Sequence, residues 1–371
     1  MILLSRRIHD KIADFAMRLN YVVYLILNPF RFKKFPKNVN RILVVELLQL
    51  GDLLVITPAL KALKNKFKYA KIDVLVNDRT KDLLYGNNNI NKILIIKDFN
   101  TLVKDLRKDK YDLGIILHPG SLKISLALLL GKVKYRIGCA KVGLLSGKGF
   151  FLNKKIKPNL RWQHKIQDNL DVVRSIGADI DNIRLEVYTD EKSRMYIKDL
   201  LKNNNITKND LVIGIHPYSK HYTQRWYEDR FSELADNLIK NYNAKIIFTG
   251  APGEENYTNS IIQKMKHKSI NLVGKTNIKQ FIALMDNIDL LISVDTSAVH
   301  IASALNKPVI ALFGPTIPQF WGPTSDKSIA IWKSSVCTGC RRYYCAIKTH
   351  ECMKSITVQD IKSSIDKILK K

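Results

Sequence analysis

The sequence predicts an α/β protein with two parallel-sheet domains that face each other across a cleft. Short apolar runs rich in Val, Ile and Leu alternate with amphipathic stretches along most of the chain, which is the pattern of βαβ units. The alternation begins at residue 41 and restarts after residue 188. A length of 371 residues also suits two domains better than one.

The first predicted domain, residues 41–188, begins with a strand–turn–helix–strand unit. The strand 41–46 (RILVVE) leads through a Gly-Asp turn into an amphipathic helix at 53–67, and the strand 72–76 follows. Such a unit is typical of an open parallel sheet. The same pattern predicts further strands at 92–96, 113–117 and 133–138, and helices at 100–108, 120–130 and 162–176.

The second predicted domain, residues 189–335, repeats this pattern. Its strands are predicted at 211–215, 245–248, 271–273, 290–294 and 309–313, and its helices at 190–203, 230–240, 256–264, 278–285 and 299–305. Residues 336–371 hold a Cys-rich segment and a C-terminal helix at 358–369, which we expect to pack back onto the first half.

The net charge is strongly positive. Lys and Arg number 61 against 33 Asp and Glu, a balance of +28, which attracts polyanions such as nucleic acid, anionic lipid or phosphorylated substrates. The abundance of Lys and Asn along the whole chain leaves a purely compositional origin open. No basic stretch is interleaved with aromatic residues as a nucleic-acid platform requires, so we expect no nucleic-acid partner.

Residues 1–40 combine an amphipathic stretch at 8–27 with a basic exit at 31–37. One interpretation is a helix that lies in the plane of an anionic membrane surface. The other is a helix packed on the domain. No apolar run near the start is long enough to span a bilayer, and no signal-peptide pattern is visible. We therefore expect a cytoplasmic protein that can touch the membrane surface.

The stretch 290–315 (LLISVDTSAVHIASALNKPVIALFGP) predicts an anion site. A buried strand leads into a helix through Asp295, Thr296 and Ser297, whose side-chain oxygens are of the kind that cap a first helical turn. The free amides and the positive dipole end of such a helix favour phosphate at the carboxyl edge of the sheet. His300 falls in the first turn, where we expect it to point at the ligand.

Two other predicted strands are followed by candidate site residues. Asp52, after Gly51, is either a helix N-cap or a carboxylate that accepts a proton from a sugar hydroxyl. Glu254, in the sequence GAPGEE, either caps a helix or holds the ribose hydroxyls of a nucleotide.

A third strand is followed by the polar loop 216–226 (HPYSKHYTQRW), which holds Ser219, Lys220 and Arg225. The loop either clamps a phosphate, with Arg225 as a planar fork of donors, or is a solvated basic loop. Trp226 at its end is expected to anchor packing rather than to stack on a base.

Four of the five cysteines, Cys337, Cys340, Cys345 and Cys352, lie close together, with His350 beside the last. These ligand types suit zinc, but the spacing matches no standard zinc finger, and disulfides are not expected in the cytosol. Reduced, packed thiols are therefore the expected state and we predict no metal ligands, with metal analysis as the deciding measurement.

Several motifs occur in an order that resembles glycosyltransferase family 9, the ADP-heptose:lipopolysaccharide heptosyltransferase family. The similar stretches are ILVVELLQLGDLLVITPALKALKNKF, Arg136-Ile-Gly138, GIHPYSKHYTQRWYEDRFSELADNL, VDTSAVHIASALNKPVIALFGPTIPQFWGP and the Cys cluster ending His350-Glu-Cys352-Met. Ser/His/Asp, Walker-type and GxGxxG patterns are not found in the context that they need. Two departures stand out: Glu46 occupies a position where family members usually carry Lys or Arg, and Ser297-Ala298 replaces a usual Gly.

The resemblance implies a GT-B fold of two Rossmann-like domains and an inverting reaction without a catalytic metal or other cofactor. It implies that residues 41–188 bind the acceptor, that residues 189–335 bind the nucleotide sugar, and that Asp52 is the general base. Arg225 would neutralise the leaving pyrophosphate and Glu254 would hold the ribose. The remaining donor-binding positions would be Ser219, Lys220, Asp295, Thr296, Ser297 and His300.

We therefore predict a glycosyltransferase that moves heptose from ADP-heptose onto a lipopolysaccharide core or a similar anionic glycolipid. The expected place of action is the cytoplasm, including a peripheral position on the inner face of the inner membrane. The first alternative is a family 9 transferase of another nucleotide sugar onto another surface glycan. The second alternative is a non-catalytic polyanion-binding protein, which predicts nucleic-acid binding with a steep salt dependence.

Overall fold

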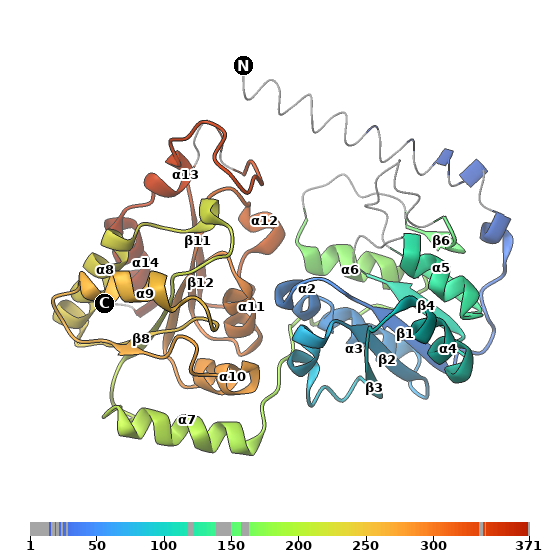
Figure 1. Ribbon diagram of the computed structural model, residues 1–371, viewed down its shortest axis with the longest axis horizontal. Helices are drawn as coiled ribbons and strands as arrows, with labels where there is room; N and C mark the ends of the chain where they lie inside the picture. The colour runs from blue at the N-terminus through green and yellow to red at the C-terminus, as the bar shows by residue number, and fades with distance from the viewer. Residues whose placement is uncertain are drawn as a thin grey trace. The chain divides into compact units, whose positions relative to one another are not determined.

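The computed structural model describes residues 15, 19, 22, 23, 25, 26, 29–117, 122–138, 150–156, 163–333, 337 and 339–369. The chain forms two compact units, residues 1–184 and 185–371. Each unit contains its own six-stranded sheet with helices around it (Figure 1). Every strand pair in both sheets is parallel, as the apolar runs predict.

The sheet of unit 1 has the strand order β3-β2-β1-β4-β5-β6. Its central strands are buried along nearly their whole length, because helices cover both faces of such a sheet. Helices α3 and α6 pack together, and so do α4 and α5. The strands are β1 Arg41–Val45, β2 Lys71–Val76, β3 Lys92–Ile95, β4 Leu113–Ile116, β5 Tyr135–Gly138 and β6 Lys154–Lys155; the α-helices are α2 Leu50–Leu54, α3 Thr57–Lys66, α4 Phe99–Asp109, α5 Leu122–Leu130 and α6 Lys165–Arg174.

The sheet of unit 2 repeats this topology with the order β12-β11-β10-β7-β8-β9. Its strands are β7 Val212–His216, β8 Lys245–Phe248, β9 Ile270–Asn271, β10 Leu290–Val294, β11 Val309–Phe313 and β12 Ser328–Trp332. The helices are α7 Glu191–Asn203, α8 Glu228–Tyr242, α9 Glu255–Gln263, α10 Ile278–Asp286, α11 Ser297–Ala304, α12 Pro318–Trp321, α13 Glu351–Lys354 and α14 Val358–Leu369.

In both units the order of the strands reverses at one place, between the first and the fourth strand. These are β1 and β4 in unit 1, and β7 and β10 in unit 2. Doubly wound sheets bind ligands at the carboxyl ends of the strands at such a switch point, because the connections leave in opposite directions there. The topology therefore marks the loops after β1 and β4, and those after β7 and β10, as the places to examine for a site.

Two expectations from the sequence are wrong. The helix expected at 53–67 is divided into α2 and α3, with Pro58 in the first turn of α3, where proline is tolerated because its missing N–H has no helical partner. The C-terminal helix α14 does not belong to the first half. It packs on α8, β11 and β12, and Ile361 and Ile365 are fully buried in the core of unit 2.

The N-terminal segment is described from residue 29 onward and at six earlier positions. The 3₁₀ helix Pro29–Phe32 is held on unit 1, where the Asn153 side chain donates to the Phe30 carbonyl at 2.8 Å and the Phe35 ring lies 5.2 Å from that of Tyr135. Earlier apolar side chains point into solvent, with Phe15 and Ile26 67% and 70% exposed. Within the described residues, no helix is long and apolar enough to cross a bilayer.

Candidate functional site

Asp52 lies in the first turn of α2, close to the carboxyl end of β1 and therefore at the switch point of unit 1. It is not the N-cap of that helix. Gln49 is the N-cap, and the two residues form a reciprocal capping box. In it, the backbone N–H of Gln49 donates to Asp52 Oδ2 at 3.3 Å. The carboxylate is half-buried.

Burial raises the pKa of two neighbouring carboxyl groups, those of Asp52 and Glu46. Burial raises the pKa of Asp52, while the Gln49 amide and the charge of Lys165 on α6 act in the opposite direction. Glu46, directly after β1, is only 3% exposed and accepts a hydrogen bond from the Leu48 amide at 2.9 Å. Burial, assisted by the charge of Asp52, raises the pKa of Glu46 to about 8, so Glu46 is largely protonated at neutral pH.

In unit 2, the helix start after β10 has the form that the sequence predicts. Thr296 is the N-cap of α11, and its hydroxyl accepts a hydrogen bond from the Ala298 amide at 3.3 Å. Ser297 opens the helix, which leaves first-turn amides at the carboxyl end of β10. His300 is only 2% exposed, and its ring lies 5.8 Å from that of Trp321. This helix start can accept an anion.

Asp295 joins the loops after β7, β10 and β11. The Gln224 side chain donates to Asp295 Oδ2 at 3.0 Å, and the Thr316 hydroxyl donates to the same oxygen at 2.5 Å. The Ser219 hydroxyl donates in turn to Gln224 Oε1 at 2.7 Å. Burial raises the pKa of Asp295 to about 6, against the effect of the Thr316 hydroxyl.

Arg225, at the end of the loop after β7, lies against a pair of aromatic rings that also contact each other. Its guanidinium carbon lies 4.0 Å from the ring centre of Tyr218 and 5.3 Å from that of Tyr257. Its Nε donates to the Ser219 carbonyl at 2.7 Å. A cavity of about 310 Å³ opens beside it and is lined in part by Tyr222, Tyr257 and His350.

Glu254 immediately precedes α9, and its carboxylate accepts a hydrogen bond from the Ala251 amide at 2.9 Å. A Cβ atom on Gly250 would lie 2.7 Å from Glu254 Oε2, so a side chain at this position would displace the Glu254 carboxylate. Burial raises the pKa of Glu254, and the charge of Arg225 acts in the opposite direction. Lys220, by contrast, is exposed, and the network around Asp295 does not include it.

The Cys-rich segment packs on the loop after β7. His350 Nε2 lies 2.8 Å from the Thr223 carbonyl, and the Thr223 hydroxyl donates to the Arg342 carbonyl at 2.8 Å. Trp226, 2% exposed, donates from its indole to the Ile356 carbonyl at 3.0 Å, which confirms its predicted anchoring role. Among the described residues, no three His, Cys, Asp or Glu side chains are arranged to hold a metal ion.

Four residues of this region are absent from the sequence-based prediction: Gln224, Thr316, Tyr218 and Tyr257. Gln224 and Thr316 stand inside motifs that the sequence marks, so their position after a strand was a usable signal. Tyr257 lies in α9, and nothing in the sequence indicates that its ring reaches Arg225.

The folding pattern defines a class of protein: two Rossmann-like units, each built on a doubly wound parallel sheet, as in GT-B glycosyltransferases. The chain matches glycosyltransferase family 9 (heptosyltransferase) over residues 99–350, and it belongs to that family. It is 30% identical over 305 residues to the lipopolysaccharide heptosyltransferase 3 of Escherichia coli (strain K12), covering 76% of this chain and 85% of that protein.

Solved structures share the fold. A family 9 glycosyl transferase from Veillonella parvula DSM 2008 superposes with a TM-score of 0.81 at 21% identity, covering 89% of this chain and 97% of that one. The E. coli ADP-heptose lps heptosyltransferase II superposes with a TM-score of 0.73 at 21% identity, covering 89% and 98%. The predicted fold class and family are both confirmed.

Proposed function

We propose that this family 9 glycosyltransferase transfers heptose from ADP-heptose onto a lipopolysaccharide core or a similar anionic glycolipid, with inversion at the anomeric carbon. The observation that carries the proposal is the switch point of unit 2. There the capped start of α11, the Asp295 network and Arg225 come from loops that follow β7, β10 and β11. Backbone amides and a guanidinium group, with a carboxylate in the same set of loops, suit a sugar joined to a diphosphate.

In the proposed reaction, the acceptor hydroxyl oxygen attacks the anomeric carbon of the donor sugar. The bond from that carbon to the diphosphate oxygen breaks as the new bond forms, and a single displacement inverts the configuration. Asp52 takes the hydroxyl proton as general base. The negative charge that develops on the departing ADP is stabilised by Arg225 and by the amides at the start of α11.

The other site residues have supporting roles in this proposal. Glu254 holds the ribose hydroxyls. Asp295, Thr296, Ser297 and His300 line the diphosphate and the sugar, and Ser219 fixes Gln224 against Asp295. Lys220, which is exposed, adds positive charge at the entrance. Because Arg225 and the helix start carry the charge of the leaving group, we propose that the reaction needs no metal ion.

The acceptor and the place of action follow from the charge. An excess of +28 attracts a phosphorylated glycolipid and the anionic lipid around it. We propose that the enzyme works in the cytoplasm at the inner face of the inner membrane.

A thermal-shift screen against ADP-, UDP-, GDP- and CMP-sugars tests the donor, because a ligand that binds only the folded state raises the melting temperature. ADP-heptose should give the largest shift. Turnover with a deacylated core acceptor, followed by mass spectrometry, should then show the mass of one added heptose and an unchanged rate in EDTA. A larger shift with another nucleotide sugar would replace the donor, and a rate abolished by EDTA would reject the metal-free mechanism.

A further inference from the structure

The surroundings of Arg225 point to a role for two tyrosines, Tyr218 and Tyr257, to which the family resemblance assigns none. The guanidinium group of Arg225 lies against two rings, with its carbon 4.0 Å from the centre of Tyr218 and 5.3 Å from that of Tyr257. Those rings meet each other edge to face, with centres 5.7 Å apart at 69°. Cations are attracted to aromatic faces, so the two rings favour this position of the guanidinium group.

Hydrogen bonds fix both sides of this arrangement. Arg225 Nε donates to the Ser219 carbonyl at 2.7 Å, which uses one of its five N–H groups. The Tyr257 hydroxyl donates to the Trp226 carbonyl at 2.7 Å, so the ring of Tyr257 is tied to the residue next to Arg225. The outer edge of the guanidinium group, with its two terminal nitrogens, makes no hydrogen bond to any residue that the structure describes.

We propose that Tyr218 and Tyr257 are positioning residues that hold Arg225 with its outer edge directed at the diphosphate of the donor. The inference rests on the proposed function, since that function supplies the diphosphate. The Tyr218 ring against the guanidinium group, the Tyr257 ring beside it and the Ser219 carbonyl at Nε leave the terminal N–H groups for a ligand. Those groups can form two parallel bonds to phosphate oxygens. Fixing the side chain before the ligand arrives also reduces the entropy lost on binding.

The proposal explains why arginine is required here. A lysine ammonium is a compact charge on a flexible stem and cannot use both rings and a planar fork together. Arg225→Lys should therefore weaken donor binding nearly as much as Arg225→Met does, although the positive charge is retained.

The test is a double-mutant cycle on ADP binding, measured by titration calorimetry with the full chain. We expect Tyr218→Leu and Tyr257→Leu each to weaken ADP binding by about three- to tenfold. Tyr257→Phe, which keeps the ring, should bind ADP within about twofold of the wild type, because its ring still faces Arg225. In an Arg225→Met background, Tyr218→Leu and Tyr257→Leu should have almost no further effect, because the tyrosines act through Arg225.

Tyr227→Leu is the matched control. The Tyr227 ring also lies on an arginine, with its centre 5.2 Å from the guanidinium carbon of Arg230, but that arginine is bonded to backbone carbonyls. This variant should bind ADP as the wild type does. Melting temperatures of all variants check folding, and Arg225→Lys tests the same idea without altering either ring.

Several outcomes would overturn the inference. Unchanged ADP affinity in both leucine variants would show that the rings do not position Arg225. Equal losses in the wild-type and Arg225→Met backgrounds would show that the tyrosines contact the nucleotide themselves. Wild-type affinity in Arg225→Lys would show that charge suffices. If the wild type binds none of ADP, UDP, GDP and CDP, both this inference and the nucleotide-sugar donor are wrong, whereas the first three outcomes leave the donor in place.

Discussion

The carboxylate of Asp52 is subject to two opposing influences. Burial raises its pKa, and the Gln49 amide and the charge of Lys165 lower it. As a general base, Asp52 must be ionised before the acceptor hydroxyl attacks, so these influences decide the lowest pH at which the enzyme works.

Asp52→Asn should reduce kcat by about 10²- to 10⁴-fold, the usual contribution of a general base, and leave ADP affinity close to the wild-type value. Steady-state kinetics and calorimetry measure the two quantities. Asp98→Asn is the control, because Asp98 is an N-cap on α4 in the same unit and asparagine caps equally well. Full turnover in Asp52→Asn would remove Asp52 as the base.

Lys165→Met should move the acidic limb of the pH profile for kcat to higher pH. Removal of the Lys165 charge eliminates one of the influences that lower the pKa of Asp52, so a larger fraction of Asp52 is protonated and inactive at any given pH. The rate above the limb should change little, since the base is ionised there in both proteins. A limb that stays in place would mean that Lys165 does not act on Asp52.

Glu46 predicts a pH dependence of stability rather than of rate. Its pKa is raised from 4.5 to about 8 in the folded protein, so the folded state favours the neutral form. The stability of the fold therefore decreases as the pH rises from about 5 through 8, where Glu46 becomes ionised. The unfolding free energy of Glu46→Gln minus that of the wild type should therefore increase by up to about 5 kcal/mol between about pH 4 and pH 9. Urea titrations at several pH values measure it, with the exposed Glu191→Gln as control.

At the scale of elements, the sequence predicts strands better than helix limits or contacts. The strand β10 and the N-cap residue Thr296 stand where the sequence places them, because an apolar run and a hydroxyl side chain are local signals. Strand β12 is missed although it is as long as β10, because it is only partly buried. The contact between Tyr257 and Arg225 is not predictable, since it depends on how α9 packs and not on any local pattern.

For the site residues too, the sequence identifies the residues themselves but not their contacts. Asp52, Arg225 and Asp295 follow strands and belong to recognisable motifs, so the sequence identifies them as candidates. What the sequence leaves open is their surroundings. Whether Asp52 caps its helix depends on Gln49, and the partners of Asp295 come from loops that lie 71 and 21 residues away.

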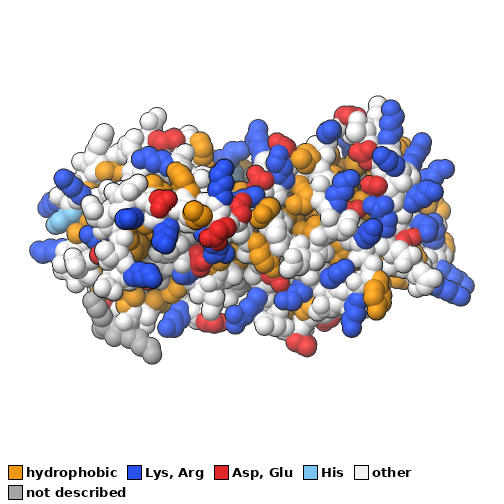
Figure 2. Space-filling view, turned by 90° about the horizontal axis from the view of Figure 1, so that it is seen from below, with side chains coloured by type: hydrophobic (Ala, Val, Ile, Leu, Met, Phe, Trp, Pro, Cys, Tyr) orange, Lys and Arg blue, Asp and Glu red, His pale blue; other side chains and the backbone are white. Residues whose placement is uncertain are grey.

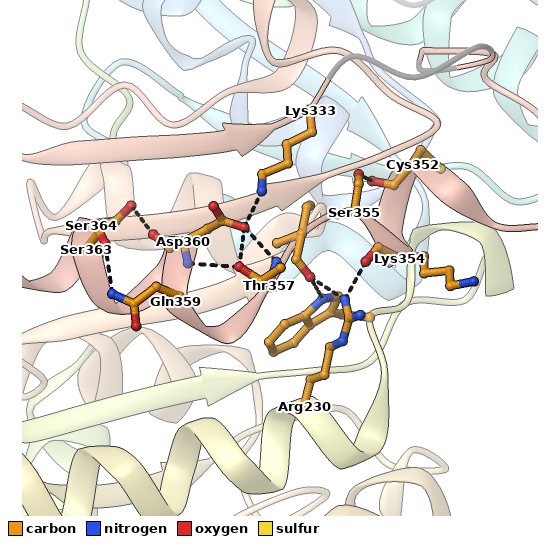
Figure 3. A network of polar contacts seen from close by, with 12 residues as sticks. Arg230, Lys333, Cys352, Lys354, Ser355, Thr357, Gln359, Asp360, Ser363 and Ser364 are labelled. Atoms are coloured by element: carbon orange, nitrogen blue, oxygen red, sulfur yellow. Dashed lines mark hydrogen bonds and ion pairs between the residues drawn. The ribbon is translucent and has the colours of Figure 1, made fainter.

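The C-terminal segment is tied to the start of α8 by backbone carbonyls. Arg230 donates to the Lys354 carbonyl at 2.6 Å and also to that of Ile356, which the Trp226 indole shares (Figure 3). At the start of α14, Asp360 accepts hydrogen bonds from Thr357 and pairs with Lys333. The residues that follow Arg225 are thus held in place by hydrogen bonds to the C-terminal segment.

Arg230→Met should lower the unfolding free energy by about 2 kcal/mol, because it removes charged donors from two carbonyls. Amide exchange should also become faster around residues 351–357, where those carbonyls lie. Arg194→Met is the matched control, since Arg194 pairs with Asp286 at an exposed site, where an ion pair contributes less than about 1 kcal/mol. Equal stability losses in the two variants would argue against the tether.

The excess positive charge is distributed over the protein surface and is not concentrated in one patch. Lys and Arg side chains are scattered over the face shown in Figure 2, with Asp and Glu among them. A charge distribution of this kind produces long-range attraction to an anionic surface without defining a groove for one polymer. The structure adds a second feature: four apolar side chains of the N-terminal stretch, Phe15, Leu19, Val22 and Ile26, are exposed and spaced three to four residues apart, whereas Val23 and Leu25 are half-buried.

These two features predict that the chain binds anionic vesicles and that residues 1–28 contribute much of the affinity. Exposed apolar side chains on one helical face insert among headgroups, while Lys and Arg are attracted to the anionic lipid. Residues from 29 onward should be kept, because Phe30 and Phe35 are packed on unit 1. The full chain should sediment with vesicles that contain phosphatidylserine, less so as salt rises, and hardly at all with neutral phosphatidylcholine. The chain lacking residues 1–28 should remain largely in the supernatant while keeping its ADP affinity; equal sedimentation of the two chains would show that the N-terminal stretch is not a membrane-binding element.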